Sequence, residues 1–251
     1  MIGKKINAYV IARAMYFRPK NRNALRNDIL LLILFSLFVS SCSTSTPPPQ
    51  VVPVFSSLAA EPWLSGLYDC AAKQNNVVLS RAHDSNSAEI VLQIGEPTVT
   101  SFAYQIDKEN IVVVMNDVRP PVVNLQQIKG IFTGQITNLN QITSGWGNVH
   151  SGESGDVHVW VYSSDSDVQR IFNKLVLEDR PVLSSAKLAV SPQNMLAVIR
   201  DDRSSVGILP QHWNSNHEVF EQAIVATVPV LALTNVEPQG VVKALIACLQ
   251  K

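Results

Sequence analysis

After residue 50, short apolar segments alternate with amphipathic ones. Apolar runs rich in Val and Ile are typical of buried β-strands, and apolar residues spaced three or four apart predict helices. The predicted strands are 51–55, 77–79, 101–106, 111–115, 157–162, 188–190, 206–209 and 225–233, with a turn at 107–110 and a short apolar segment at 90–94. The predicted helices are 62–73, 125–132, 166–177, 192–200 and 240–250. Strands that alternate with helices predict an α/β fold, in which helices cover the faces of parallel sheets.

Residues 1–42 have the pattern of a secretory signal. Basic residues precede an apolar run at 29–39, and the small residues Ser40 and Ser41 lead to Cys42. A basic region, an apolar region of this length and a small-residue site together form a signal peptide. The segment Val39–Cys42 also resembles a bacterial lipobox, in which the cysteine is lipidated. We expect Cys42 to anchor the protein to the outer face of the cell membrane. A membrane-spanning anchor is the alternative, although the run is shorter than the roughly 20 apolar residues that a spanning helix needs.

Residues 43–50 are rich in Ser, Thr and Pro. A segment of this composition buries no core, and consecutive prolines favour an extended spacer. We predict a tether between the anchor and the folded part. A disordered terminus would have the same composition.

Removal of the signal changes the charge balance. The whole chain has 20 basic and 20 acidic residues, and residues 1–42 hold seven basic and one acidic, which leaves 13 and 19 and a net charge of −6. Nucleic-acid binding needs clustered positive charge, so we expect no nucleic-acid partner. The roughly 200 remaining residues suffice for one large domain or two smaller lobes.

The chain has three cysteines, Cys42, Cys70 and Cys248. With Cys42 assigned to lipid, one cysteine remains in the first predicted helix and one in the last. Outside the cytoplasm two such thiols are commonly paired. A disulfide between Cys70 and Cys248 would close a long loop of the unfolded chain and stabilise the fold by about 2–4 kcal/mol. Two buried, unpaired cysteines are the alternative.

The segment 125–139, LQQIKGIFTGQITNL, has the pattern of a short amphipathic helix, a glycine stop and a polar turn. It resembles a signature of the extracytoplasmic phosphate-binding protein family, in which a motif of the form IF.G.I.NW recurs. Weaker landmarks of that superfamily occur in the same order, namely IVVVMN at 111–116, VHVWVY at 157–162, SPQNM at 191–195 and SVGILP at 205–210. The resemblance extends over about residues 51–251, and its specific part is 131–138.

The resemblance implies a two-lobed fold of the type 2 periplasmic-binding-protein class, with parallel or mixed sheets and two crossing hinge strands. Residues 51–116 and 206–251 would form lobe I, and residues 117–205 would form lobe II. Members of the superfamily bind a small anionic ligand in the cleft between the lobes and deliver it to an ABC permease. We therefore expect a monomeric solute-binding lipoprotein whose ligand is phosphate or a related oxyanion.

Loops that contain Ser or Asn precede three of the predicted helices or apolar segments. A helix N-terminus has unpaired N–H groups and the positive end of the dipole, and hydroxyl side chains add donors for an oxyanion. The predicted ligand-binding residues are Ser56, Ser57, Asn86, Ser87, Ser163, Ser164, Ser166 and Asp167. The same residue types are ordinary helix N-caps, which is the alternative for each loop taken alone.

The third of these loops, 163–167, departs from the family's pattern. The family has an arginine shortly before the loop and glycines within it, whereas this chain has neither and adds Asp165 and Asp167. Arg81 and Arg119 are candidates for the missing positive charge. A degenerate pocket in a sensory or interaction module of the same fold is therefore the alternative function.

The sequence has no catalytic or metal-binding motif that we recognise. Its five histidines show no metal-ligand spacing, and a Gly-x-Ser-x-Gly elbow, a Walker loop and closely paired cysteines are all missing. We therefore predict neither an enzyme nor a metal or cofactor site.

Overall fold

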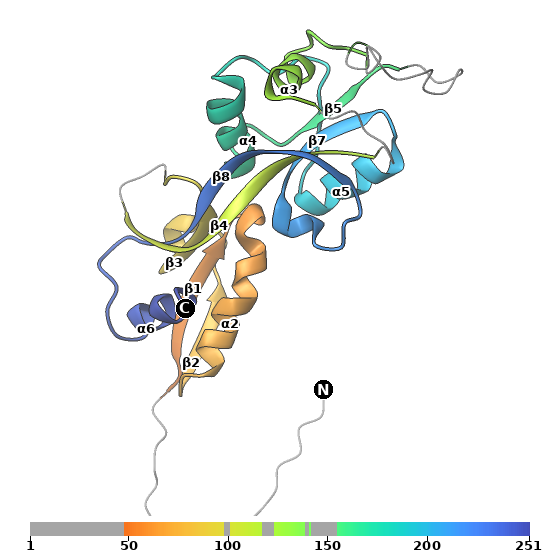
Figure 1. Cartoon of the computed structure of the whole chain (residues 1–251). Coiled ribbons are helices and arrows are strands. Elements are labelled where there is room, and N and C mark those ends of the chain that lie inside the picture. Colours follow the sequence, from red (N-terminus) through yellow and green to blue (C-terminus); the bar gives the residue numbers. More distant parts are fainter. Residues whose placement is uncertain (1–47, 98–100, 117–122, 139–140, 142–154) are drawn as a thin grey trace, which may run out of the picture. The chain divides into compact units, whose positions relative to one another are not determined.

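Eight strands form one mixed sheet in the computed structural model, which describes residues 48–97, 101–116, 123–138, 141 and 155–251 (Figure 1). The predicted signal peptide, Cys42, Arg119 and most of the predicted tether lie outside the described residues. Within the described ranges, no helix has the length and apolar character needed to cross a membrane.

The strands lie in the order β2-β1-β3-β8-β4-β7-β5-β6. Their bounds are β1 Gln50–Ser56, β2 Val77–Arg81, β3 Ile90–Ile94, β4 Phe102–Met115, β5 His158–Val161, β6 Lys187–Leu188, β7 Ser205–Pro210 and β8 Phe220–Thr234. β1 pairs in parallel with β2 and with β3, and we call these three strands the first strand group. β5 pairs in parallel with β6 and with β7, and we call these three strands the second strand group.

The two strand groups are joined by the long antiparallel pair β4–β8, which crosses the middle of the sheet (Figure 1). The pairing extends from Phe102 opposite Thr234 to Met115 opposite Phe220. β3 pairs with the C-terminal part of β8, and β7 pairs with the C-terminal part of β4. Each long strand therefore borders one strand group and also extends along the other long strand.

The turn predicted at 107–110 is wrong, because β4 continues through it. These polar residues pair with Thr227–Val230 of β8, and a β-bulge lies just before Asp107. The Asp107 carboxylate accepts hydrogen bonds from the Lys108 N–H at 2.8 Å and from the Trp63 indole at 2.9 Å. Long-range pairing thus satisfies a polar segment whose composition is typical of a turn.

Helices cover the sheet on both sides of this central pair (Figure 1). The α-helices are α2 Leu64–Ala72, α3 Leu125–Phe132, α4 Asp167–Phe172, α5 Pro192–Asp201 and α6 Gly240–Leu249. The shorter segments are η1 Leu58–Trp63, η2 Ser85–Ser87, η4 Asn173–Leu177 and η5 Gln211–Asn214. The helix predicted at 62–73 is thus part of η1 followed by α2, and the one predicted at 166–177 is α4 continued by the π-helical η4. The strand predicted at 188–190 is the shorter β6, which begins one residue earlier.

The helix predicted at 125–132 is α3, and local signals explain both of its ends. The Asn124 side chain accepts a hydrogen bond from the Gln127 N–H, and the Gln127 side chain accepts one from the Asn124 N–H, each at 2.9 Å. This reciprocal pair is a capping box. Gly134 has a φ of +78°, a conformation that glycine adopts without a steric penalty just beyond a helix.

Cys70 in α2 and Cys248 in α6 are joined by a disulfide, the pairing that the sequence left open. The two residues are 178 positions apart in the chain, and their Cα atoms are 5.9 Å apart. The bond restricts the unfolded chain and contributes about 2–4 kcal/mol to stability. It also fixes the packing of α6 against α2, at the first strand group.

Glu109 is a buried acidic residue in the central part of β4, with only 2% of its surface exposed. Its Oε1 accepts hydrogen bonds from the backbone N–H groups of Asn110 at 2.9 Å and His212 at 3.3 Å. Its Oε2 is buried and has no hydrogen-bond partner among the described residues. Burial raises the pKa of Glu109 from 4.5 to about 7, although the backbone hydrogen bonds lower it.

We expect Glu109→Gln to flatten the dependence of stability on pH. The Glu109 pKa is 4.5 in the unfolded chain and about 7 in the folded protein, so the unfolded chain ionises first and wild-type stability falls between these values. The full loss amounts to about 3 kcal/mol, and it is absent from the variant. Urea denaturation of both proteins across this pH range measures the effect. The exposed Glu89, changed to Gln, is the matched control, and parallel stability curves for wild type and Glu109→Gln would contradict the assignment.

Candidate functional site

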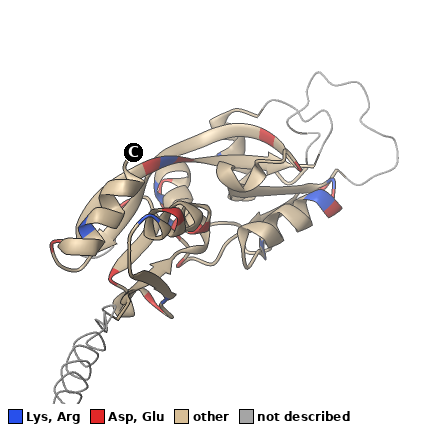
Figure 2. Ribbon diagram, turned by 90° about the horizontal axis from the view of Figure 1, so that it is seen from below, with Lys and Arg blue, Asp and Glu red and all other residues tan. Residues whose placement is uncertain are grey.

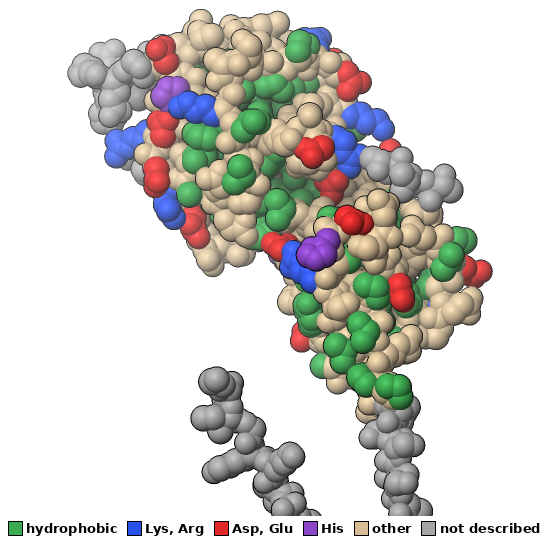
Figure 3. Space-filling view, turned by 180° about the vertical axis from the view of Figure 1, so that it is seen from behind, with side chains coloured by type: hydrophobic (Ala, Val, Ile, Leu, Met, Phe, Trp, Pro, Cys, Tyr) green, Lys and Arg blue, Asp and Glu red, His purple; other side chains and the backbone are tan. Residues whose placement is uncertain are grey.

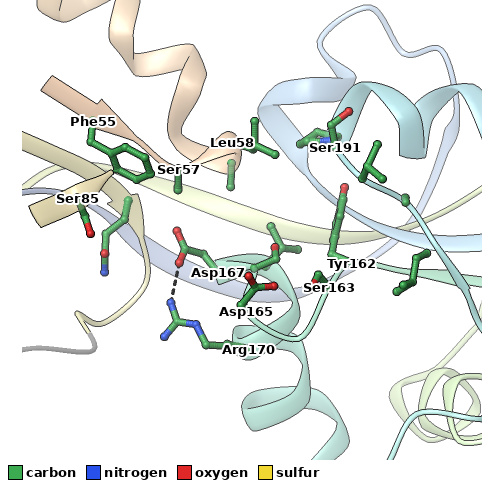
Figure 4. A pocket seen from close by; sticks show the side chains of 18 of the residues that line it. Phe55, Ser57, Leu58, Ser85, Tyr162, Ser163, Asp165, Asp167, Arg170 and Ser191 are labelled. Carbon is green, nitrogen blue, oxygen red and sulfur yellow. Dashed lines mark hydrogen bonds and ion pairs between the residues drawn. The ribbon is translucent and has the colours of Figure 1, made fainter. Parts of the chain in front are cut away.

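A cavity of about 670 Å³ lies between the first and second strand groups (Figure 4). On one side its wall comes from the ends of β1 and β3 and from η1 and η2. On the other side the wall comes from the loop after β5, from α4, and from the segment between β6 and α5. Its lining residues include Phe55, Ser57, Leu58, Ser85, Val91 and Gln93 on the first side, and Tyr162, Ser163, Asp165, Ser166, Asp167, Arg170, Leu188, Val190 and Ser191 on the second.

All three of the loops predicted to bind a ligand reach this cavity, but only some of their residues line it. The predicted residues that line it are Ser57, Ser163, Ser166 and Asp167, and the neighbouring Ser85 and Asp165 also line it. Three loops that are distant in the chain thus meet at one cavity.

The other four predicted residues do not line the cavity. Ser56 is buried, and its hydroxyl donates to the backbone carbonyl of Ser57 at 2.9 Å. The backbone N–H groups of Asn86 and Ser87 both donate to Oδ1 of Asp84 at 2.9 Å, so the second loop is an ordinary cap of η2. Ser164 is exposed.

Ser57 lines the cavity and holds a polar atom that has no partner in the described structure. Its Oγ is buried and has no hydrogen-bond partner among the described residues. Ser57 immediately precedes η1, yet its side chain does not cap that segment. Because buried hydroxyl groups are nearly always hydrogen-bonded, this atom is an exception in the described structure.

Tyr162 and Asp167, which line the opposite wall, hold two further atoms of this kind. The Tyr162 hydroxyl and Asp167 Oδ2 are buried and lack partners in the described part of the chain. Tyr162 is 5% exposed, and burial raises the pKa of its hydroxyl above the ordinary value. Its position is fixed by the Tyr162 backbone N–H, which donates to the Gln169 side chain at 2.9 Å. In Figure 4 the Tyr162 hydroxyl is directed toward Ser191, away from Arg170.

Arg170 supplies the positive charge of the site. Its Nη2 forms an ion pair with Oδ1 of Asp167 at 2.6 Å, three residues earlier on α4 (Figure 4). The Asp167 side chain is 10% exposed and that of Arg170 is 35% exposed. Arg81, a candidate for this role from the sequence, pairs with Glu61 at 2.5 Å instead and does not line the cavity.

The charged residues that line the cavity are Asp165, Asp167 and Arg170, and their formal charges sum to −1. A hydrogen bond from the Ser163 side chain lowers the pKa of Asp165, which is therefore ionised at neutral pH. Elsewhere on the described ribbon, basic and acidic residues are interspersed (Figure 2). On the face shown in Figure 3, charged side chains lie mostly around the edges of the upper part, with hydrophobic ones between them.

The described residues contain no group of three or more His, Cys, Asp or Glu that could hold a metal ion. The hydrogen-bonding groups of the cavity are hydroxyls, amides, two carboxylates and one guanidinium. Such a set binds a polar organic molecule or an oxyanion through hydrogen bonds and ion pairs.

The sequence matches no family model and no curated protein. The structure, however, is similar to a candidate phosphate ABC transporter substrate-binding protein from Clostridium perfringens, solved with bound phosphate, with a TM-score of 0.67 and 15% identity over 80% of this chain and 93% of that one. It is also similar to an ABC-type phosphate transport receptor from Vibrio cholerae, with a TM-score of 0.58 and 17% identity over 80% and 93%. This chain has the type 2 periplasmic-binding-protein fold.

The predicted fold class and the predicted resemblance to phosphate-binding proteins are thus confirmed at the level of structure. A mutant of the OxyR2 regulatory domain from Vibrio vulnificus is also similar, with a TM-score of 0.55 and 8% identity over 80% of this chain and 93% of that one. The type 2 periplasmic-binding-protein fold therefore occurs in regulatory domains as well as in transport proteins. The fold alone does not identify the ligand.

We expect Tyr162→Phe to leave the folded protein equally stable or to stabilise it by about 1 kcal/mol. A buried polar group without a partner costs free energy, and the substitution removes that group while keeping the aromatic ring. Urea denaturation measures the change, with Tyr104→Phe, at a partly exposed tyrosine outside the cavity, as the control. Destabilisation by Tyr162→Phe alone would mean that the hydroxyl has a partner within the protein.

Proposed function

We propose that this protein is a solute-binding lipoprotein outside the cytoplasm, which captures phosphate or a related oxyanion in the cavity and delivers it to an ABC permease. The main support is that three buried polar atoms without partners among the described residues, Ser57 Oγ, the Tyr162 hydroxyl and Asp167 Oδ2, belong to residues that line one cavity. Similarity to two phosphate-transport proteins supports the same assignment.

The chemistry of the wall suits an oxyanion held by hydrogen bonds. The hydroxyls of Ser57 and Tyr162 can donate to its oxygens from opposite sides. Arg170 uses Nη2 for Asp167, and its other N–H groups can donate to the ligand. Asp167 Oδ2 can accept a hydrogen bond from a protonated oxygen of the ligand. These contacts would fix both the charge and the protonation state of the ligand.

A ligand in this position would contact residues from both strand groups. We propose that residues 51–116 with 206–251 form lobe I, that residues 117–205 form lobe II, and that β4 and β8 form the hinge. A ligand that binds more tightly when both walls are close shifts the population toward a closed form, which the permease can recognise. The protein acts as a monomer in this scheme.

A second candidate function is a sensory or interaction module at the cell surface. The observation that favours it is the negative charge of the cavity, because Asp165 and Asp167 outnumber Arg170. The similarity to a regulatory domain shows that the fold is also used outside transport.

Titration calorimetry of the full chain with phosphate, sulfate, molybdate and tungstate tests capture of an oxyanion. We expect at least one of the four to bind with one ligand per chain. Ser57→Ala should weaken that binding about fivefold, because one hydrogen bond is worth roughly 1 kcal/mol. Ser164→Ala, which changes an exposed serine of the third loop, should leave the affinity unchanged. If none of the four anions produces binding heat, the protein does not capture inorganic oxyanions, and the second candidate function is favoured.

Anchoring through Cys42 has its own test. We expect wild-type protein to incorporate labelled palmitate and to sediment with membranes. Cys42→Ser should lose the label and appear in the soluble fraction, because lipid is the proposed anchor. Ser45→Ala, a change in the tether, serves as the control. Membrane retention of Cys42→Ser would instead identify the apolar run at 29–39 as the anchor.

A further inference from the structure

The charges that line the cavity are unbalanced toward the negative. Arg170 is the one cation among the described lining residues, and its charge is already offset by Asp167 at 2.6 Å. Asp165 lies in the same wall and has no cation paired with it among the described salt bridges. A doubly charged anion entering this cavity would therefore meet a net repulsion.

The unsatisfied carboxylate oxygen shows what kind of group would compensate. Asp167 Oδ2 is buried in a side chain that is 10% exposed, and it has no partner in the described part of the structure. Because Oδ1 of the same group is paired with Arg170, Oδ2 is left as an acceptor of hydrogen bonds. A positively charged donor satisfies such an acceptor most strongly.

The size of the cavity also argues for an organic ligand. Its volume of about 670 Å³ lies within the range of roughly 300–1,000 Å³ that is usual for pockets that bind organic molecules. Apolar side chains, including Phe55, Val91 and Leu188, line it together with the polar groups. A few methylene groups of a ligand would contact this part of the wall.

We propose that the ligand is a small zwitterion, in which an oxyanion group and an ammonium group are joined by a short carbon chain. This inference rests on the proposed function and narrows its ligand class. The oxyanion group accepts hydrogen bonds from Ser57 and Arg170. The ammonium group donates to Asp167 Oδ2, and the charge of Asp165 favours it further. A protonated inorganic oxyanion could also donate to Asp167, but it carries no positive charge for the exposed Asp165 to attract.

Two probes of almost equal size test the ammonium group directly. 2-Aminoethylphosphonate and propylphosphonate differ in that the first ends in an ammonium group and the second in a methyl group. Titration calorimetry of the full chain should show 2-aminoethylphosphonate binding at least about tenfold more tightly, as expected for a charge-assisted hydrogen bond.

A variant of Asp167 links this preference to the proposed contact. Asp167→Asn keeps the shape of the side chain and an oxygen for Arg170, but removes the negative charge. We expect it to weaken 2-aminoethylphosphonate binding about tenfold and to strengthen propylphosphonate binding, because Arg170 is then free to pair with the phosphonate. Asp201→Asn, at a 73% exposed aspartate outside the cavity, is the matched control and should change neither affinity.

The possible outcomes separate this inference from the proposed function. If the wild-type protein binds propylphosphonate or phosphate as tightly as 2-aminoethylphosphonate, or more tightly, the proposal of a zwitterionic ligand is wrong. The proposed oxyanion site would not be affected by that result. An unchanged preference in Asp167→Asn would overturn the assigned contact. No binding of phosphate, propylphosphonate or 2-aminoethylphosphonate would overturn the proposed function itself.

Discussion

The antiparallel pairing of β4 with β8 is the interaction on which the rest of the structure depends. Each strand group is parallel, and its connections between strands stay within its own side of the sheet. β4 and β8 provide the hydrogen-bonded ladder that joins the two groups, and the cavity lies between those groups. The geometry of the site is therefore set by the twist and register of two strands that contribute no residue to its lining.

The residues that line the candidate site include some whose burial is unfavourable for stability. Ser57, Tyr162 and Asp167 each have a buried polar atom without a partner among the described residues, and a buried polar group that stays unpaired generally costs about 1–3 kcal/mol. The disulfide and the apolar core offset this cost. Buried polar atoms without partners are rare in protein interiors. Three of them in residues around one cavity therefore indicate a ligand site more strongly than the serine-rich loops of the sequence do.

Local signals made part of the structure predictable. The capping box of Asn124 and the glycine at 134 lie within a few residues of α3, so the sequence was sufficient to place this helix. The turn predicted at 107–110 failed because its polar residues are satisfied by β8, which is distant in the chain. Arg170 was not predicted, because the family's pattern has its arginine before the third loop and Arg170 follows that loop. The spacing of Asp167 and Arg170, three residues apart on a predicted helix, was the available signal.

The disulfide gives the two sides of the sheet unequal resistance to partial unfolding. It links α2 to α6 beside the first strand group. The described residues around the second strand group are held together by packing and hydrogen bonds, without a disulfide. Proteins open in cooperative units of different stability. The second strand group with α3, α4 and α5 would then exchange its amide hydrogens sooner, and the wall that carries Tyr162 and Asp167 would be the side of the cavity that opens more readily.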